Sequence, residues 1–229
     1  MPLDPTAAIE ITGLVWVPDF ARGFVRDTRA RWALEEVGLP YRMRLVDFEE
    51  AKGKGHRALQ PFGQIPTYSD GEVEIFESGA IAIRIAEQGS GLIPTDPNGR
   101  ARAIQWVIAA LNSVEPFLLQ LVFIDMFEAD KPWSAGRRPG VLEMVQSRLH
   151  DLSAALGDKQ WLDGKFSVGD LMMVSVLRQL HYSRLLDDYP NLAAFVARGE
   201  ARPAFRQALA DHLATFDDQP PQAQERAAS

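Results

Sequence analysis

The chain has 229 residues, of which 46% are hydrophobic and 24% are charged, and this length suits one large domain or, as we expect, two small ones. The net charge of -7 argues against a general affinity for nucleic acid phosphates or anionic membrane surfaces and favours a small-molecule partner. The absence of cysteine excludes disulfides, thiolate metal sites and thiol-disulfide chemistry by the protein's own side chains.

Neither a targeting signal nor a membrane span is expected. The N-terminus lacks the basic region and the apolar run of a secretory signal, so we predict a cytoplasmic protein. The most apolar stretch, residues 103–127, carries too many polar side chains for a lipid-embedded span and is predicted to be a buried helix. The four histidines show no paired ligand spacing, so no metal is predicted.

The first half of the chain alternates strands and helices. Gly38-Leu39-Pro40 ends the first predicted helix, and Asp70-Gly71 is typical of a hairpin turn. In chain order the predicted elements are a strand at 11–17, a helix at 25–37, a strand at 41–46, a weak helix at 49–59, strands at 65–69 and 72–76, and a helix at 78–88. Residues 1–89 are therefore predicted to form an α/β domain of order βαβαββα.

The second half is predicted to be entirely helical. Residues 90–99 are rich in glycine, proline and polar side chains and mark the domain boundary. The helices expected beyond it are at 100–127, with an interruption at Pro116, and at 140–156, 168–182, 189–201 and 203–216. The helical domain thus spans 100–216, and the tail at 217–229 has no apolar period and is predicted to be disordered.

A proline at the start of a strand forms the first motif of interest. Gly63-Gln64-Ile65-Pro66 places a residue without an N–H where it cannot donate to a sheet ladder. If the Ile65–Pro66 bond is cis, the backbone N–H and C=O of Ile65 would face outward and could pair with an extended peptide. A trans proline at the start of an edge strand is the alternative.

Glu77 and Ser78 form the second motif, at the start of a predicted helix. A serine hydroxyl and free backbone N–H groups there can bind a carboxylate, and Glu77 can accept from an ammonium. Together they match the two charges of an amino-acid head group. Ser78 could equally serve only as a helix cap.

The combination of these elements and motifs resembles the glutathione-binding domain of the glutathione transferase superfamily over about residues 10–90. The phrases RWALEEVGLPY at 31–41 and QPFGQIP at 60–66 look like that family's first helix and its proline turn. In the second half, FSVGDL at 166–171 is similar to the capping motif of a central helix in the family's C-terminal domain, and there Ser167 and Asp170 would have a structural role.

This resemblance implies a thioredoxin-like N-terminal domain that binds glutathione as co-substrate. A cis Ile65–Pro66 bond becomes the favoured expectation, with main-chain atoms of Ile65 holding the cysteinyl part of glutathione and with Glu77 and Ser78 holding its γ-glutamyl end. The residues that could meet the glycyl carboxylate are Gln64, with Lys52 or His56 from the preceding segment.

The sequence departs from the family at the group that activates the thiol. Most members use a Tyr, Ser or Cys just after the first strand, and no such residue occurs before residue 41. We predict that Arg22 or Arg26, with Thr28 as the nearby hydroxyl, replaces it, because a cation near the sulfur favours the thiolate. The alternative is that both arginines are solvated surface charges paired with Asp19 and Asp27.

The leading functional prediction is transfer of glutathione to a small hydrophobic electrophile in detoxification, or a related isomerisation or peroxide reduction. Apolar side chains along the long helix are expected mostly in the core or at a subunit contact, and a minority could line the electrophile's pocket. These are Trp106, Leu111, Phe117, Leu121, Phe123 and Phe127. The resemblance also implies a homodimer. A non-catalytic binding or assembly module of the same fold is the alternative, which the missing activator favours.

Overall fold

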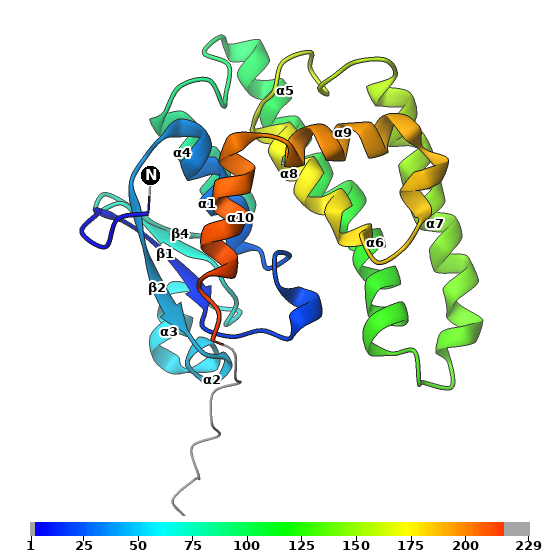
Figure 1. Cartoon of the computed structure of the whole chain (residues 1–229), viewed down its shortest axis with the longest axis horizontal. Coiled ribbons are helices and arrows are strands. Elements are labelled where there is room, and N and C mark those ends of the chain that lie inside the picture. Colours follow the sequence, from blue (N-terminus) through cyan, green and yellow to red (C-terminus); the bar gives the residue numbers. More distant parts are fainter. Residues whose placement is uncertain (1–2, 218–229) are drawn as a thin grey trace, which may run out of the picture.

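A computed structural model describes residues 3–217, so the predicted disordered tail lies, apart from Asp217, outside the described residues. A small mixed sheet with its helices forms one end of the molecule, and longer helices form the other (Figure 1). The prediction of an α/β N-terminal half followed by a helical C-terminal half is confirmed.

The sheet has four strands in the order β2-β1-β3-β4. Strand β1 (Ile9–Leu14) runs parallel to β2 (Tyr41–Val46), and β3 (Thr67–Ser69) runs antiparallel to both β1 and β4 (Glu74–Phe76). The predicted hairpin is present, but its strands are shorter than predicted because β3 begins only after the proline turn. Strand β1 lies slightly earlier in the chain than predicted.

The helices of this half are α1 (Asp27–Val37), α2 (Phe48–Lys52), α3 (Lys54–Leu59) and α4 (Ser78–Gln88), with a 3-10 turn η1 (Asp19–Ala21) before α1. Gly38 ends α1 with a left-handed φ of 70°, and its N–H donates to the Leu34 carbonyl. The single helix predicted at 49–59 is two short ones, because Gly53 is extended between them.

A long helical run begins the second half. It consists of α5 (Pro97–Ile108), a π-helical segment η2 (Ala109–Val114), α6 (Glu115–Val122) and a second π-helical segment η3 (Phe123–Phe127). The predicted interruption falls just before Pro116, where the N–H of Glu115 donates to the Ala110 carbonyl, five residues back. The run Pro97–Phe127 is long and apolar enough to cross a membrane by composition, but here its buried face packs against other helices of this half.

The remaining helices are α7 (Ser134–Leu156), α8 (Val168–Leu177), η4 (Arg178–Leu180), η5 (Leu185–Asp188), α9 (Pro190–Glu200) and α10 (Pro203–Leu213). Helix α7 begins earlier than predicted, since Pro139 is accommodated inside it. The predicted capping box of α8 is present: the Ser167 hydroxyl accepts from the Gly169 N–H (3.2 Å), and the Asp170 carboxylate accepts from the Ser167 N–H (2.9 Å).

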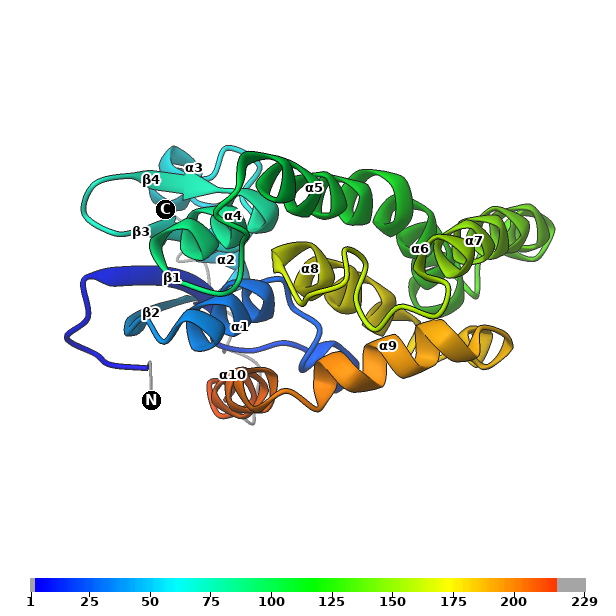
Figure 2. The same cartoon turned by 90° about the horizontal axis from the view of Figure 1, so that it is seen from above.

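The two halves share one hydrophobic core. Helix α8 lies between α5 and α9, and α10 returns to lie along α1 in the N-terminal half (Figures 1 and 2). Buried side chains from both halves, among them Trp32, Ile81 and Leu171, belong to the same core cluster. Helix α1 is therefore covered on several sides, which matters for the charged residues it carries.

Candidate functional site

A cavity of about 190 Å³ lies where the proline turn, the start of α4, helix α1 and the long helical run meet. It is lined by Arg26, Arg29, Gln60, Gln64, Ile65, Pro66, Glu77, Ser78, Leu111 and Glu115. All five residues predicted to bind glutathione, from both motifs, are in this lining. Of the three predicted thiol activators, only Arg26 is.

The proline turn presents an open backbone edge to the cavity. The Ile65–Pro66 bond is cis. Neither the N–H nor the C=O of Ile65 makes a hydrogen bond to residues 3–217. Both groups are therefore available to an extended ligand.

The turn is held from behind by the short helices that precede it. Lys52 Nζ donates to the Gly63 carbonyl (2.9 Å), and His56 Nε2 donates to the Gln64 carbonyl (2.6 Å). The side-chain carbonyl of Gln60 accepts from the backbone N–H groups of Phe62 (2.7 Å) and Gln64 (3.2 Å). His56 is buried, and neither His56 nor Lys52 lines the cavity, so in this structure both support the turn.

The start of α4 differs from a simple serine cap. Glu77 occupies the cap position with a φ of 73°, a left-handed conformation that is costly for a residue with a side chain and is found mainly at functional sites. Ser78 is the first helical residue, and no side chain caps this helix. The hydroxyl of Ser78 instead accepts a hydrogen bond from Arg29 Nη1 (3.1 Å). Capping alone therefore does not account for Ser78.

Helix α4 approaches the long helical run closely behind this serine. A Cβ at Gly79 would lie 2.5 Å from Cδ1 of Leu111. A side chain at this position would require Leu111, which lines the cavity, to shift.

A charge cluster around the buried carboxylate of Glu115 forms another part of the cavity wall. Glu115 accepts from Arg29 Nη2 (2.6 Å), Arg26 Nη2 (3.3 Å) and Gln179 Nε2 (2.8 Å). Burial alone would raise the pKa of Glu115, but the two arginines hold it below its ordinary value. Burial lowers the pKa of Arg29, an effect that Glu115 opposes. The cavity thus holds two cations and two carboxylates, counting Glu77.

Sequence reasoning missed Arg29 and Glu115. Arg29 gives no signal of its own, because a charged residue in a helix is usually solvated. Glu115 does give one, since it interrupts the most apolar stretch of the chain and a buried carboxylate needs a cationic partner. Its partner could have been sought among the arginines of the first helix.

The other two predicted activators lie away from the cavity lining. Arg22 donates to the carbonyl of Asp217 (3.0 Å), lies 3.3 Å from the carboxylate of Asp19 and packs over Phe216. The Thr28 hydroxyl donates to the Val25 carbonyl one turn back (2.7 Å). These contacts explain both residues without a ligand.

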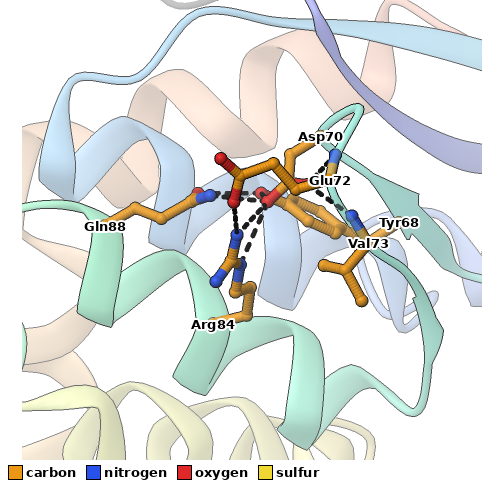
Figure 3. Close-up of polar contacts among 6 residues, drawn as sticks. All are labelled: Tyr68, Asp70, Glu72, Val73, Arg84 and Gln88. Carbon is orange, nitrogen blue, oxygen red and sulfur yellow. Dashed lines mark hydrogen bonds and ion pairs between the residues drawn. The ribbon is translucent and has the colours of Figure 1, made fainter.

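The hairpin that precedes α4 is fastened to it mainly by the carboxylate of Asp70, and the carboxylate of Glu72 also accepts from Arg84 at 3.1 Å (Figure 3). Asp70 Oδ1 accepts from the backbone N–H groups of Glu72 and Val73, both at 3.0 Å. Its Oδ2 accepts from Arg84 (2.8 Å) and Gln88 (2.6 Å) on α4. Burial opposes the charge, but these donors hold the pKa of Asp70 well below its ordinary value. The helix that carries Ser78 is thereby fixed to the sheet.

Among residues 3–217, no group of three or more His, Asp or Glu side chains is arranged to hold a metal ion. The prediction that the protein uses no metal stays a prediction.

Family models and relatives match the chain along most of its length. A model described as the N-terminal domain of glutathione S-transferase matches residues 21–87, and one described as its C-terminal domain matches residues 122–212. Glutathione S-transferase F14 of Arabidopsis thaliana is 29% identical over 201 residues, which cover 80% of this chain and 79% of the relative.

Solved structures agree. A glutathione transferase of Burkholderia graminis, with two glutathione molecules bound per subunit, is 28% identical with a TM-score of 0.76, covering 88% of this chain and 87% of that one. A theta class glutathione S-transferase of Xanthomonas axonopodis pv. citri with glutathione bound is 27% identical with a TM-score of 0.76, covering 89% and 98%. With both of the family's domains matched and the predicted fold present, the chain belongs to the glutathione S-transferase superfamily.

Proposed function

We propose that the cavity binds glutathione and that the protein is a glutathione transferase. One observation carries this: the unpaired backbone edge of Ile65 and the start of α4 converge on the same cavity. Ile65 pairs with the cysteinyl backbone, Ser78 and the first N–H groups of α4 bind the γ-glutamyl carboxylate, and Glu77 accepts from its ammonium. Gln64 also lines the cavity and directly precedes Ile65 in the sequence, and we assign it to the glycyl carboxylate. The relatives described with glutathione bound support this ligand.

Arg26 is the proposed activator of the thiol. Its side chain is 39% exposed at the cavity wall, and its one hydrogen bond to the described residues leaves other guanidinium donors free. A cation beside the bound sulfur stabilises the thiolate, the reactive form.

Replacing Arg26 by Ala is expected to raise the pKa of the bound glutathione thiol by about 1 unit, because a partly exposed cation of the cavity wall is removed. Thiolate absorbance in the complex, followed against pH, measures this. Arg22→Ala is the matched control, since Arg22 contacts Asp19 and Asp217 rather than the cavity, and it should leave the thiol pKa unchanged. An unchanged pKa in Arg26→Ala would rule out the arginine mechanism.

The second substrate is proposed to be a small hydrophobic electrophile, with isomerisation or peroxide reduction as related reactions. Exposed aromatic side chains support an apolar partner: Phe20 of η1 packs edge-on against Phe127 of η3 (5.3 Å between ring centroids), which also contacts Phe123 (5.4 Å). These rings are about half exposed, and Phe20 belongs to the segment that leads into α1.

Assembly and location follow from the family and are proposals as well. We propose a homodimer, which would cover apolar side chains left exposed in the single chain, such as Phe62 (61% exposed) and Ile108 (57% exposed). We propose a cytoplasmic enzyme of detoxification that binds neither nucleic acid nor membrane.

Calorimetric titration with glutathione, followed by conjugation assays over a panel of hydrophobic electrophiles, tests the proposal. Binding together with turnover of at least one electrophile is the expected result. Binding without turnover would favour the non-catalytic module. The absence of a Tyr, Ser or Cys activator also supports that alternative. Failure to bind glutathione would refute the transferase and leave only a partner-binding or assembly module of the same fold.

A further inference from the structure

The backbone of residues 18–24, the segment that leads toward α1, is linked to the other described residues by a single hydrogen bond. The N–H groups of residues 21, 22 and 24 donate to carbonyl groups three residues earlier, which also belong to the segment. Among residues 3–217, the one backbone group of the segment that bonds outside it is the Gly23 carbonyl, which accepts from Arg178 Nη1 (2.9 Å). Because Arg26 follows at the N-cap of α1, this contact helps to determine where that arginine lies at the cavity wall.

Arg178, the first residue of η4, is itself held by a second hydrogen bond and two aromatic rings. Its Nε donates to Glu200 Oε1 at the end of α9 (2.7 Å), and its side chain is 9% exposed. The guanidinium carbon lies 4.8 Å from the ring centroid of Phe24 and 4.7 Å from that of Phe205. A planar guanidinium with these four partners has few other orientations.

The residues that follow in the chain strengthen the contact between η4 and the start of α1. His181 stacks on Phe24, with ring centroids 3.8 Å apart and ring planes 13° apart. Gln179 Nε2 donates to Glu115 Oε1 (2.8 Å), the same carboxylate oxygen that accepts from Arg26 (3.3 Å). The region of η4 therefore holds both the backbone that precedes Arg26 and the carboxylate paired with its guanidinium.

We propose that Arg178 is a positioning residue: it holds the segment before α1 so that Arg26 faces the sulfur of bound glutathione, and it thereby tunes the reactivity of the thiol from outside the cavity. The proposal rests on the function proposed above, with Arg26 as the activator. Charge interactions weaken with distance and with exposure to water, so an arginine that leaves the cavity wall stabilises a thiolate less. Arg178 does not line the cavity, so it acts through Arg26 and not by contact with the ligand.

Arg178→Met tests this in the full-length protein, because methionine still packs against the two rings but cannot donate to the Gly23 carbonyl. The pKa of the bound glutathione thiol, followed by thiolate absorbance, is expected to rise by about 0.5 unit. At a pH below that pKa, the Kd for glutathione should stay within about 2-fold of the wild-type value, because Ile65, Glu77 and Ser78 lose no contact. A merely structural role of Arg178 would instead weaken glutathione binding.

A double variant separates positioning from charge. If Arg178 acts through Arg26, adding Arg178→Met to Arg26→Ala should leave the thiol pKa at the value of Arg26→Ala alone, whereas a direct effect of the Arg178 charge would add to it. Arg198→Met is the matched control. Arg198 also donates to a backbone carbonyl, that of Gln160 (2.8 Å), and lies over an aromatic ring, but both partners belong to the helical half, so the thiol pKa should be unchanged.

Three results would each overturn the inference: an unchanged thiol pKa in Arg178→Met, a shift that persists in full in the double variant, or loss of glutathione binding in Arg178→Met. If Arg178→Met does not fold, Phe24→Leu removes the ring on which Arg178 and His181 pack, and it should raise the thiol pKa in the same way. No rise in that variant would equally overturn the inference. Binding of glutathione by the wild-type protein would leave the proposed function standing in all these cases.

Two other results would remove the basis of the inference. If Arg26→Ala leaves the thiol pKa unchanged, the inference falls together with the arginine mechanism. If the wild-type protein binds no glutathione, it falls together with the proposed function.

Discussion

Asp70 shows how one side chain positions a ligand-binding helix it does not belong to. Its carboxylate closes the hairpin turn and reaches Arg84 and Gln88 on α4 (Figure 3). The side chain is 5% exposed, so the loss of its charge weakens hydrogen bonds that hold a buried carboxylate between the hairpin turn and α4. The turn itself needs Gly71, whose φ is 86°.

Asp70→Asn is therefore expected to lower the free energy of unfolding by about 2 kcal/mol near neutral pH, measured by chemical denaturation. Because the folded pKa of Asp70 lies below its ordinary value, its contribution is present above about pH 4 and is lost as the pH falls further. Asp163→Asn, which breaks the more exposed pair with Arg102, should cost less than about 0.5 kcal/mol. Equal losses in the two variants would contradict the account.

Glu35 changes the pH dependence of stability in the direction opposite to Asp70, because its pKa is raised rather than lowered. Burial and, secondarily, Asp211 on α10 raise the pKa of Glu35 to about 7. Between its ordinary value of 4.5 and that pKa the folded protein holds a proton that the unfolded chain has released, so stability falls as the pH rises through this range.

Glu35→Gln removes this penalty. The variant should be more stable than the wild-type protein by roughly 1 kcal/mol at pH 8, after allowance for partial exposure, and nearly equal to it at pH 4. Thermal unfolding at the two pH values measures this. A variant that is no more stable at pH 8 would show that Glu35 ionises freely in the folded state.

At the scale of elements, helix α1 is the least ordinary part of the molecule. It buries Asp27, Arg29 and Arg31 because it lies against α4, α8 and α10 as well as the sheet. Asp27 Oδ2 accepts from Arg31 Nε (2.9 Å) and lies 3.2 Å from His212 Nδ1 on α10. Burial alone would raise the pKa of Asp27, but His212 and Arg31 hold it below its ordinary value.

Asp27→Asn should cost about 3 kcal/mol of unfolding free energy at neutral pH, because Arg31 is then a buried cation without its carboxylate. Replacing both Asp27 and Arg31 by Leu and Met should cost less than Asp27→Asn alone, since no uncompensated charge remains. Denaturant titration of the three proteins provides the comparison. If the double variant is the least stable, the ion pair contributes more than charge compensation.

These elements also show what the sequence could and could not predict. The sequence predicts the bounds of α4 and β2 and the capping box of α8, because local signals determine them. These signals are turn residues, a C-cap glycine and a Ser-x-x-Asp spacing. Helix α7 begins at Ser134 rather than at the predicted residue 140, and Pro139 lies inside it.

The candidate site likewise contains some residues that the sequence could predict and others that it could not. Ile65 was predicted from a proline at the start of a strand and Ser78 from its place at the start of a helix, and both line the cavity. The Arg29–Glu115 pair joins residues far apart in sequence across the two halves. The sequence signals only that Glu115 needs a cation, and the tertiary packing shows that Arg29 is the partner. Arg22 and Arg26 are near neighbours in sequence, but only Arg26 reaches the cavity, because Arg22 turns toward the C-terminal segment.

At the scale of the whole molecule, the two halves act on one site. The N-terminal half provides the proline turn and the start of α4, and the helical half provides Leu111 and Glu115. Helix α10, the last helix described, then packs along α1 and completes the covering of the helix that carries Arg26 and Arg29 (Figure 1). A ligand in this cavity would therefore touch both domains at once.

A crystal structure of the protein with glutathione tests this account most directly. We expect the cysteinyl backbone within about 3.2 Å of both the N–H and the C=O of Ile65, and the γ-glutamyl carboxylate at the same distance from the Ser78 hydroxyl. Glutathione bound elsewhere, or bound in the cavity without touching either residue, would contradict it.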